Sequence, residues 1–156
     1  MSLPPFQRVL DTHAADVHRF LVAAVGPVDA DDCFQETFLS ALRAYPRLRP
    51  DSDLRAWVLT IAHRKALDHH RARTRRPVPA SGTLPEAAAP PPAAARDDTL
   101  WDRVHGLPAK QRAAVLLRFA ADLSHREVGT VLGCSEAAAR RSAHEGLKKL
   151  RQEHRA

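Results

Sequence analysis

The chain has 156 residues, a formal net charge of +6 and a pI of about 10.1, which allows one ordinary domain or two small ones and favours polyanionic partners such as nucleic acid. Its two cysteines, Cys33 and Cys134, are too few and too far apart for a disulfide framework or a CxxC zinc pair, and each lies in an apolar helical pattern that predicts a buried free thiol. No stretch approaches the roughly 20 apolar residues of a membrane span and no secretory signal opens the chain, so we expect a cytoplasmic protein without membrane insertion.

Apolar residues recur at helical spacing throughout the sequence, and no segment alternates as a strand does, which predicts an all-α fold. Charge is distributed unevenly along the chain. Residues 1–45 carry three Lys or Arg against six Asp or Glu, whereas residues 46–76 carry nine against three and residues 100–156 carry eleven against six. Two separate basic regions therefore follow an acidic N-terminal one.

A segment rich in Pro and Ala separates the two basic regions. Residues 77–99 contain six prolines, which lack a backbone donor and restrict φ, so neither helix nor sheet is expected there. We interpret this segment as a semi-extended linker that joins two small helical domains, at residues 1–76 and 100–154.

The first domain is predicted to hold three helices, over about residues 4–25, 29–45 and 53–75, because a Gly-Pro pair and two further prolines interrupt the apolar periodicity. Packed along their apolar stripes, these helices form a small bundle. The positions expected to face its core in the first and third helices are Phe6, Val9, Leu10, Val17, Phe20, Leu21, Leu54, Trp57, Val58 and Ile61.

The second helix, DADDCFQETFLSALRAY, has two distinct faces. One is an apolar core stripe that consists of Phe34, Phe38, Ala41, Leu42 and Tyr45. The other face has acidic and polar residues around one leucine, and it consists of Asp32, Gln35, Glu36, Leu39 and Arg43. Early carboxylates suit the positive end of a helix, so this second face is either a solvated surface or a docking surface for a basic helical partner.

The third helix, LRAWVLTIAHRKALDHHRARTRR, gathers cations toward its C-terminal end. A few such cations suit the helix dipole, but contacts to nucleic-acid phosphates explain the excess better. The histidines His63, His69 and His70 raise the alternative of a metal site. Asp68 is the one carboxylate among them, which does not complete the ligand set of a metal centre, so we expect no metal.

The segment LSHREVGTVLGCSEAAARRSAHEGLKKLR, residues 123–151, has the pattern of a helix-turn-helix. Ser124 and Glu127 form a capping box that starts a first helix, and Gly133 suits the turn that ends it. Gly129 allows a close approach between helices, and Ser135 caps the second helix. A plain helical hairpin shares part of this pattern, but the combination favours a DNA-binding unit.

The second helix of this motif again has two faces. Ala139, Ala143, Leu147 and Leu150 form its inward row, and the preceding helix is expected to pack inward through Val115, Leu116 and Phe119. Arg can bond two guanine acceptors, Glu can accept from cytosine and Ala can touch a thymine methyl. The outward residues expected to face bases are Glu136, Ala137, Arg140, Arg141 and His144, and those expected to hold phosphates are Arg126, Lys148, Lys149 and Arg151.

In this order, the acidic helix DADDCFQETFLSALRAY, the basic helix LRAWVLTIAHRKALDHHRARTRR, the Pro/Ala linker and the terminal helix-turn-helix resemble the extracytoplasmic-function (ECF) sigma factors of bacterial RNA polymerase. The resemblance covers nearly the whole chain. It implies sigma region 2 at residues 1–76, sigma region 4 at residues 100–154, and a factor without cofactor or catalytic residues that directs promoter-specific transcription initiation.

The resemblance also implies partners for each surface. The polymerase-binding residues, which would dock on the clamp helices of the largest subunit, are Asp32, Gln35, Glu36 and Leu39. The residues implied to bind and open the minus-ten promoter element are Arg55, His63, Arg64, Arg71 and Arg73. Those implied to bind the minus-thirty-five element are Arg126, Glu136, Ala137, Arg140, Arg141, His144 and Lys148. Many family members are also held by an anti-sigma protein.

The sequence departs from the family pattern at three places. Arg64 stands where asparagine is common, so capture of a single-stranded base could differ. The recognition helix reads Ala-Ala-Ala-Arg-Arg-Ser at 137–142, which leaves the promoter sequence open, and Glu145 replaces a common basic residue.

Two other classes of protein are alternatives to an ECF sigma factor. A stand-alone helix-turn-helix regulator would use the C-terminal module alone, and the acidic face near Glu36 would be inert. An enzyme is disfavoured because no Ser/His/Asp arrangement, Gly-rich phosphate loop or paired-carboxylate spacing occurs.

Overall fold

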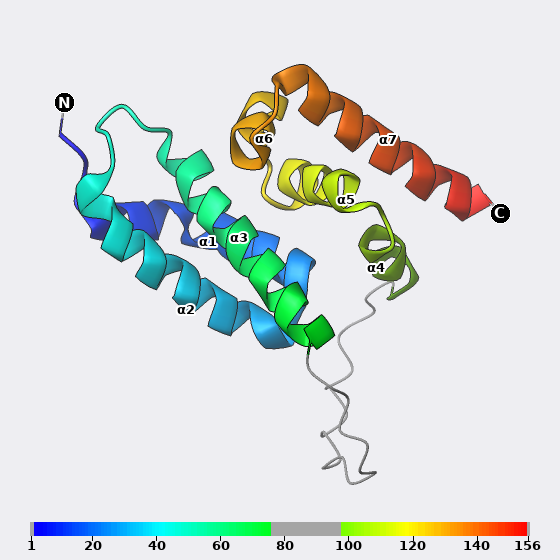
Figure 1. The fold of residues 1–156 in the computed structure, drawn as a ribbon, viewed down its shortest axis with the longest axis horizontal. Helices are drawn as coiled ribbons and strands as arrows, with labels where there is room; N and C mark the ends of the chain where they lie inside the picture. The colour runs from blue at the N-terminus through cyan, green and yellow to red at the C-terminus, as the bar shows by residue number, and fades with distance from the viewer. Residues whose placement is uncertain (1, 76–97, 156) are drawn as a thin grey trace, which may run out of the picture.

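The structure is a computed structural model that describes residues 2–75 and 98–155 (Figure 1). Every element in this described part is helical, which confirms the all-α prediction. The linker predicted at 77–99 lies outside the described residues except for its last two, which already belong to a helix. The elements are α1 (Phe6–Val25), α2 (Pro27–Ala44), the 3-10 turn η1 (Tyr45–Arg47), α3 (Leu54–Arg75), α4 (Asp98–His105), α5 (Ala109–Val115), the π-helical turn η2 (Leu116–Ala120), α6 (His125–Leu132) and α7 (Glu136–Arg155).

Helices α1, α2 and α3 pack against one another as an N-terminal bundle, and their bounds lie within two residues of the predicted ones. The chain leaves α1 at Gly26, whose N–H donates to the Val22 carbonyl at 3.0 Å, and Pro27 opens α2 at a first-turn position where no backbone donor is needed. Asp53 caps α3, because its Oδ1 accepts from the backbone N–H of Ala56 at 3.1 Å.

The core stripe predicted for α2 is correct at Phe38 and Ala41 but wrong at Leu42, which is 50% exposed. Smaller residues take the inward positions, since Cys33 and Thr37 are buried and the Thr37 hydroxyl donates to the Cys33 carbonyl at 2.7 Å. The inward row of α2 thus passes through Ala41. Leu42, rotated by about 100° from it, points to solvent.

Helices α4 to α7 form a C-terminal bundle that contains the predicted helix-turn-helix. Ser124 Oγ accepts from the Glu127 N–H at 3.1 Å, and Ser135 Oγ accepts from the Ala138 N–H at the same distance. Gly133 ends α6 in the left-handed conformation with φ of 69°, which costs a glycine little. The local signals of the motif are therefore confirmed.

A single π-helical turn changes which side chains face the core of the C-terminal bundle. The Ala121 N–H donates to the Leu116 carbonyl at 3.2 Å, a bond that spans five residues, so the register shifts relative to an α-helix. Leu116 and Leu117 are buried, whereas Phe119, predicted to pack inward, is 57% exposed.

The two cysteines differ in their surroundings. Cys33 is buried in α2 as predicted, but the prediction of a buried Cys134 is wrong, because this residue is exposed. Cys134 directly follows the turn residue Gly133, and α7 begins two residues later at Glu136, so Cys134 lies in the turn and not on the apolar side of a helix.

The two bundles contact each other through α1 and α3 on one side and η2 and α6 on the other. Figure 1 shows α5 and α6 beside α3, on the side away from α2. Buried residues form one contiguous cluster that extends from Val17 and Leu59 in the N-terminal bundle to Leu117 and Val128 in the C-terminal bundle. The described chain thus has a shared core, in which α3 lies at the contact and α7 packs on the far side of the C-terminal bundle.

Candidate nucleic-acid interface

Helix α7 presents a polar, basic face to solvent. Ala139 and Ala143 are buried against the rest of the C-terminal bundle, which leaves the opposite side of the helix free of intramolecular packing. The residues predicted to face DNA are all exposed, namely Arg126, Glu136, Ala137, Arg140, Arg141, His144 and Lys148.

The α6–α7 turn fixes how this face is presented. Gly129 lies so close to the turn that a Cβ there would be 2.7 Å from the carbonyl oxygen of Cys134. On α7 itself, Arg140 Nη2 pairs with Glu136 Oε1 at 3.0 Å, one helical turn earlier. Exposed pairs of this kind contribute little to stability, so the Arg140 guanidinium can exchange Glu136 for a base edge or a phosphate at small cost.

The C-terminal half of α3 forms a second basic surface. Arg71 and Arg73 are 65% and 66% exposed, and Arg64 is exposed as well. Arg71 Nη1 lies 3.8 Å from Asp68 Oδ1, and Arg73 Nη1 lies 3.6 Å from Asp29 Oδ2, which are loose pairs at the surface. These three predicted DNA-binding residues are available to an external partner.

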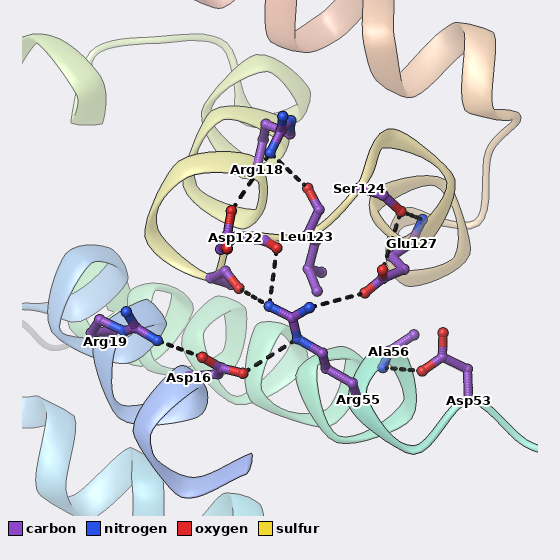
Figure 2. Close-up of polar contacts among 11 residues, drawn as sticks. Asp16, Arg19, Asp53, Arg55, Ala56, Arg118, Asp122, Leu123, Ser124 and Glu127 are labelled. Atoms are coloured by element: carbon purple, nitrogen blue, oxygen red, sulfur yellow. Dashed lines mark hydrogen bonds and ion pairs between the residues drawn. The ribbon is translucent and has the colours of Figure 1, made fainter. Parts of the chain in front are cut away.

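Arg55, the remaining arginine predicted to bind the minus-ten element, is engaged within the chain (Figure 2). Its Nη2 donates to the carbonyl oxygens of Ala121 at 2.7 Å and Asp122 at 3.0 Å, both in the segment between η2 and α6. Its Nε lies 3.3 Å from Asp16 Oδ2 of α1, and its Nη1 lies 3.7 Å from Glu127 Oε2 of α6. One guanidinium therefore connects α1, α3 and the helix-turn-helix.

His63 also lies at the contact between the bundles. It lines a small cavity of about 20 Å³ together with Phe20 of α1 and Arg112 of α5. Burial lowers the pKa of His63, and the charges of Arg112 and Arg64 lower it further, so the imidazole is neutral at physiological pH. Of the residues predicted to bind the minus-ten element, Arg55 and His63 thus face the other bundle and the remaining three face solvent.

The acidic face of α2 is open along its length. Asp32, Gln35 and Glu36 are exposed, and Leu39 is 52% exposed beside the equally exposed Leu42. Two solvated leucines next to carboxylates resemble a partly apolar interface with a charged rim more than a surface adapted only to water. Sequence reasoning missed Leu42 as a member of this face, because its spacing from Phe38 matches a core stripe.

Sequence reasoning also missed the carboxylates that hold Arg55. Asp16 carried no signal in the sequence, and Glu127 was explained completely by its role in the capping box. Glu127 serves both purposes, since its backbone N–H donates to Ser124 Oγ while its Oε2 faces Arg55.

In the part of the chain that the structure describes, no group of three or more His, Cys, Asp or Glu side chains comes together as a metal site. No described helix is long and apolar enough to cross a membrane.

Comparisons with known proteins identify the family. The Sigma-70 region 2 model matches residues 9–76, and the Sigma-70 region 4 model matches residues 97–150. The RNA polymerase sigma factor CarQ of Myxococcus xanthus is 36% identical over 154 residues, which cover 94% of this chain and 87% of that protein. The ECF RNA polymerase sigma factor SigD of Mycobacterium tuberculosis is 34% identical over 160 residues, with 94% and 76% covered. The chain belongs to the ECF sigma factors.

Solved structures share the fold of this sigma factor. The sigma factor RpoE from Bartonella quintana, crystallised with the anti-sigma factor NepR, aligns with a TM-score of 0.74 at 22% identity and covers 94% of each chain. CnrH, in complex with the cytosolic domain of CnrY, aligns with a TM-score of 0.71 at 20% identity, with 94% of this chain and 85% of that chain covered. The N-terminal bundle thus corresponds to sigma region 2 and the C-terminal bundle to sigma region 4.

Proposed function

We propose that this ECF sigma factor binds core RNA polymerase through the acidic face of α2 and directs it to promoters through the basic surfaces of α3 and α7. The observation that carries the proposal is the presence of three separate exposed surfaces in one chain of this family. One is acidic and apolar on α2, and two are basic, on α3 and on the helix-turn-helix. A regulator that never joins polymerase would need only the last of them.

The polymerase-docking surface consists of Asp32, Gln35, Glu36 and Leu39, to which we add Leu42. Their exposure supports a helical partner that offers cations to the carboxylates and an apolar ridge to the leucines. Because α2 holds these side chains on one rigid helix, binding orders few new degrees of freedom in the sigma factor. We propose the clamp helices of the largest polymerase subunit as this partner.

The two basic surfaces serve different parts of the promoter. We propose that Arg140, Arg141 and Glu136 contact base edges of the minus-thirty-five duplex, while Arg126 and Lys148 hold phosphates. Arg64, Arg71 and Arg73 follow the minus-ten strand, and Arg55 and His63 join them only after leaving the contact between the bundles. The chain acts through binding energy, and none of these steps involves covalent chemistry.

Contact with both promoter elements requires the bundles to separate. The two elements are centred about 25 base pairs apart, which corresponds to about 85 Å of duplex. A compact chain of 156 residues has a radius of gyration of about 15 Å. The arrangement in Figure 1 therefore represents the free factor, and we propose that polymerase binding holds the bundles apart.

An anti-sigma factor is the other proposed partner. One solved structure with this fold is the complex of the sigma factor RpoE with the anti-sigma factor NepR, and another is the complex of CnrH with the cytosolic domain of CnrY. Apolar side chains exposed on α2 would be among the surfaces that such an inhibitor could cover in competition with polymerase.

Gel filtration of the purified chain with bacterial core RNA polymerase tests the proposed function. We expect co-elution, and we expect Glu36→Lys to weaken it because the substitution reverses a charge in the docking surface. Asp11→Lys makes the same change in charge at an exposed position of α1 and serves as the matched control. A wild-type chain that elutes apart from active core while still binding DNA would favour the stand-alone regulator.

A further inference from the structure

Three histidines and one arginine line the contact between the bundles. His63 and His70 extend from α3, His105 extends from the end of α4, and Arg112 lies on α5. We call these four residues the histidine seam. The seam is distinct from the surfaces proposed to bind polymerase and the minus-thirty-five element.

The seam joins the two bundles at short range. The ring centroids of His70 and His105 are 6.2 Å apart with the planes inclined at 67°. His70 Nε2 donates to the Ala24 carbonyl at 2.9 Å, while His105 hydrogen-bonds the Ala23 backbone in the other bundle. Arg112 Nη1 donates to the His105 carbonyl at 3.0 Å and fixes the guanidinium next to the rings.

We propose that the histidine seam is a proton-sensitive latch, which holds regions 2 and 4 together while its imidazoles are neutral and releases them when the imidazoles become protonated. A seam of this composition brings titratable rings of two bundles around a permanent cation. Protonation therefore places like charges against one another in a partly buried space.

In the described part of the chain, few negatively charged groups lie near the imidazole rings to stabilise their protonated form. From α1 the rings meet the apolar Phe20 and the backbone of Ala23 and Ala24, and from α5 they meet the positive Arg112. On α3 the neighbouring charged or titratable groups are Arg64 and His69. Among the described residues, Asp102 is the carboxylate that acts on the seam, and it lies on α4 with His105. Because Asp102 and His105 lie on the same helix, their attraction does not hold the two bundles together.

The direction of the pKa shifts agrees with this geometry. Burial is the largest cause that lowers the pKa of His63, His70 and His105, and the charge of Arg112 lowers each of them further. The hydrogen bonds to the Ala24 and Ala23 backbone and the charge of Asp102 raise the pKa of His70 and His105 in part, but the net direction for all three rings is downward. In an open chain the same rings are solvated and regain the ordinary value of about 6.5. The closed form therefore binds fewer protons than the open form, and it is favoured above about pH 6.5 and loses that advantage as the pH falls below it.

Release of the latch has a consequence for the DNA-binding surfaces. His63 belongs to the seam, and Arg55 lies in the same contact between the bundles, held by Asp16 and Glu127. When the bundles separate, both side chains are exposed together with the side of α6 that covered α3. Protonation of the seam thus favours separation of the bundles, which is the same change that contact with both promoter elements requires.

Small-angle X-ray scattering of the isolated full chain tests the latch without polymerase, so its outcome is independent of the proposed function. We expect the radius of gyration to rise from about 15 Å at about pH 7.5 to above about 20 Å at about pH 5.5, as two compact halves separate. Far-UV circular dichroism recorded in parallel should show unchanged helix content. A wild-type radius that is the same at both pH values overturns the proposal.

Variants of the seam residues test whether the pH-dependent expansion arises from the histidine seam. The triple variant His63→Gln, His70→Gln and His105→Gln should lose more than half of the pH-dependent expansion, whereas His144→Gln on the exposed face of α7 should retain it. Expansion of the triple variant equal to that of the wild type contradicts the latch.

If the triple variant is already open at neutral pH, the variant Arg112→Gln provides the test. Loss of its charge should move the opening midpoint to lower pH, and an unchanged midpoint overturns the proposal.

Discussion

Arg55 of α3 and Glu127 of α6 form an ion pair between the two bundles, with Nη1 3.7 Å from Oε2 (Figure 2). The same guanidinium donates to two carbonyl oxygens of the segment that leads into α6, at Ala121 and Asp122. Asp122 has a positive φ of 55°, which is uncommon for a residue other than glycine, so this segment has a defined and unusual conformation. A residue expected to meet promoter DNA is thus used in the free chain to position the helix-turn-helix.

Replacing Arg55 should therefore destabilise the free chain. Arg55→Ala leaves two carbonyl oxygens without this donor and Glu127 without this cation, while Asp16 keeps its pair with Arg19, and we expect the free energy of unfolding to fall by about 1.5–3 kcal/mol. Urea denaturation followed by circular dichroism measures the change. Arg71→Ala, at a position 65% exposed and paired loosely with Asp68, should cost less than about 0.5 kcal/mol. Equal losses in the two variants would contradict the positioning role of Arg55.

Gly129 should not tolerate even one added methyl group. In Gly129→Ala the new Cβ would lie 2.7 Å from the Cys134 carbonyl oxygen, a backbone atom that cannot move without shifting the α6–α7 turn. We expect a loss of about 1–3 kcal/mol in thermal or chemical unfolding, which is typical of overpacking. Gly106→Ala is the control, because its Cβ would meet its nearest neighbours at 3.4 Å. A Gly129→Ala variant as stable as this control would argue against the close approach.

The outward residues of α7 should differ in how they affect DNA binding. Arg141→Ala should weaken binding to the preferred sequence by about 1–3 kcal/mol and relax the preference at one base pair. Lys148→Ala should weaken binding to all sequences alike and reduce the slope of log K against log salt by about one. Titrations of holoenzyme on promoter and scrambled duplexes at several salt concentrations distinguish the two effects. The same loss on both duplexes for Arg141→Ala would exclude base readout by that residue.

The two thiols should react at very different rates. Burial raises the pKa of Cys33, and the neighbouring carboxylates of Glu36, Asp29 and Asp32 raise it further, so the reactive thiolate is scarce at neutral pH. A disulfide reagent should modify the exposed Cys134 in a fast phase and Cys33 in a slow one that accelerates with rising pH. Cys134→Ser should remove the fast phase alone. Loss of the slow phase instead would mean that Cys33 is the accessible thiol and would contradict its burial in α2.

Local chemistry made most of the fold predictable from the sequence. The Gly-Pro break before α2, the Ser124 and Ser135 caps and the turn at Gly133 each depend on residues within a few positions of one another, and each is confirmed. Phe119 could not be placed in the same way. One π-helical turn changes the register of every later side chain in its helix, and apolar spacing does not reveal that turn.

The contact between the bundles was beyond sequence reasoning for a different reason. Arg55 and Glu127 are far apart along the chain, and each had a complete local explanation, as a DNA-binding cation and as part of a capping box. Pairwise attraction between charges depends on distance in space, which helical periodicity does not provide. The exposure of Leu42 could not be predicted from the sequence either, because the packing of α2 against its neighbours decides which apolar residues face inward.

The most direct test of the proposed function is transcription by core RNA polymerase on genomic DNA fragments of the source organism, with and without the chain, and with the 5′ ends of the transcripts mapped. We predict discrete start sites that require the chain, share two upstream sequence elements and are lost when Arg140 and Arg141 are both replaced by Ala. A core preparation that initiates normally with its housekeeping sigma factor but yields no start site dependent on this chain would contradict the assignment.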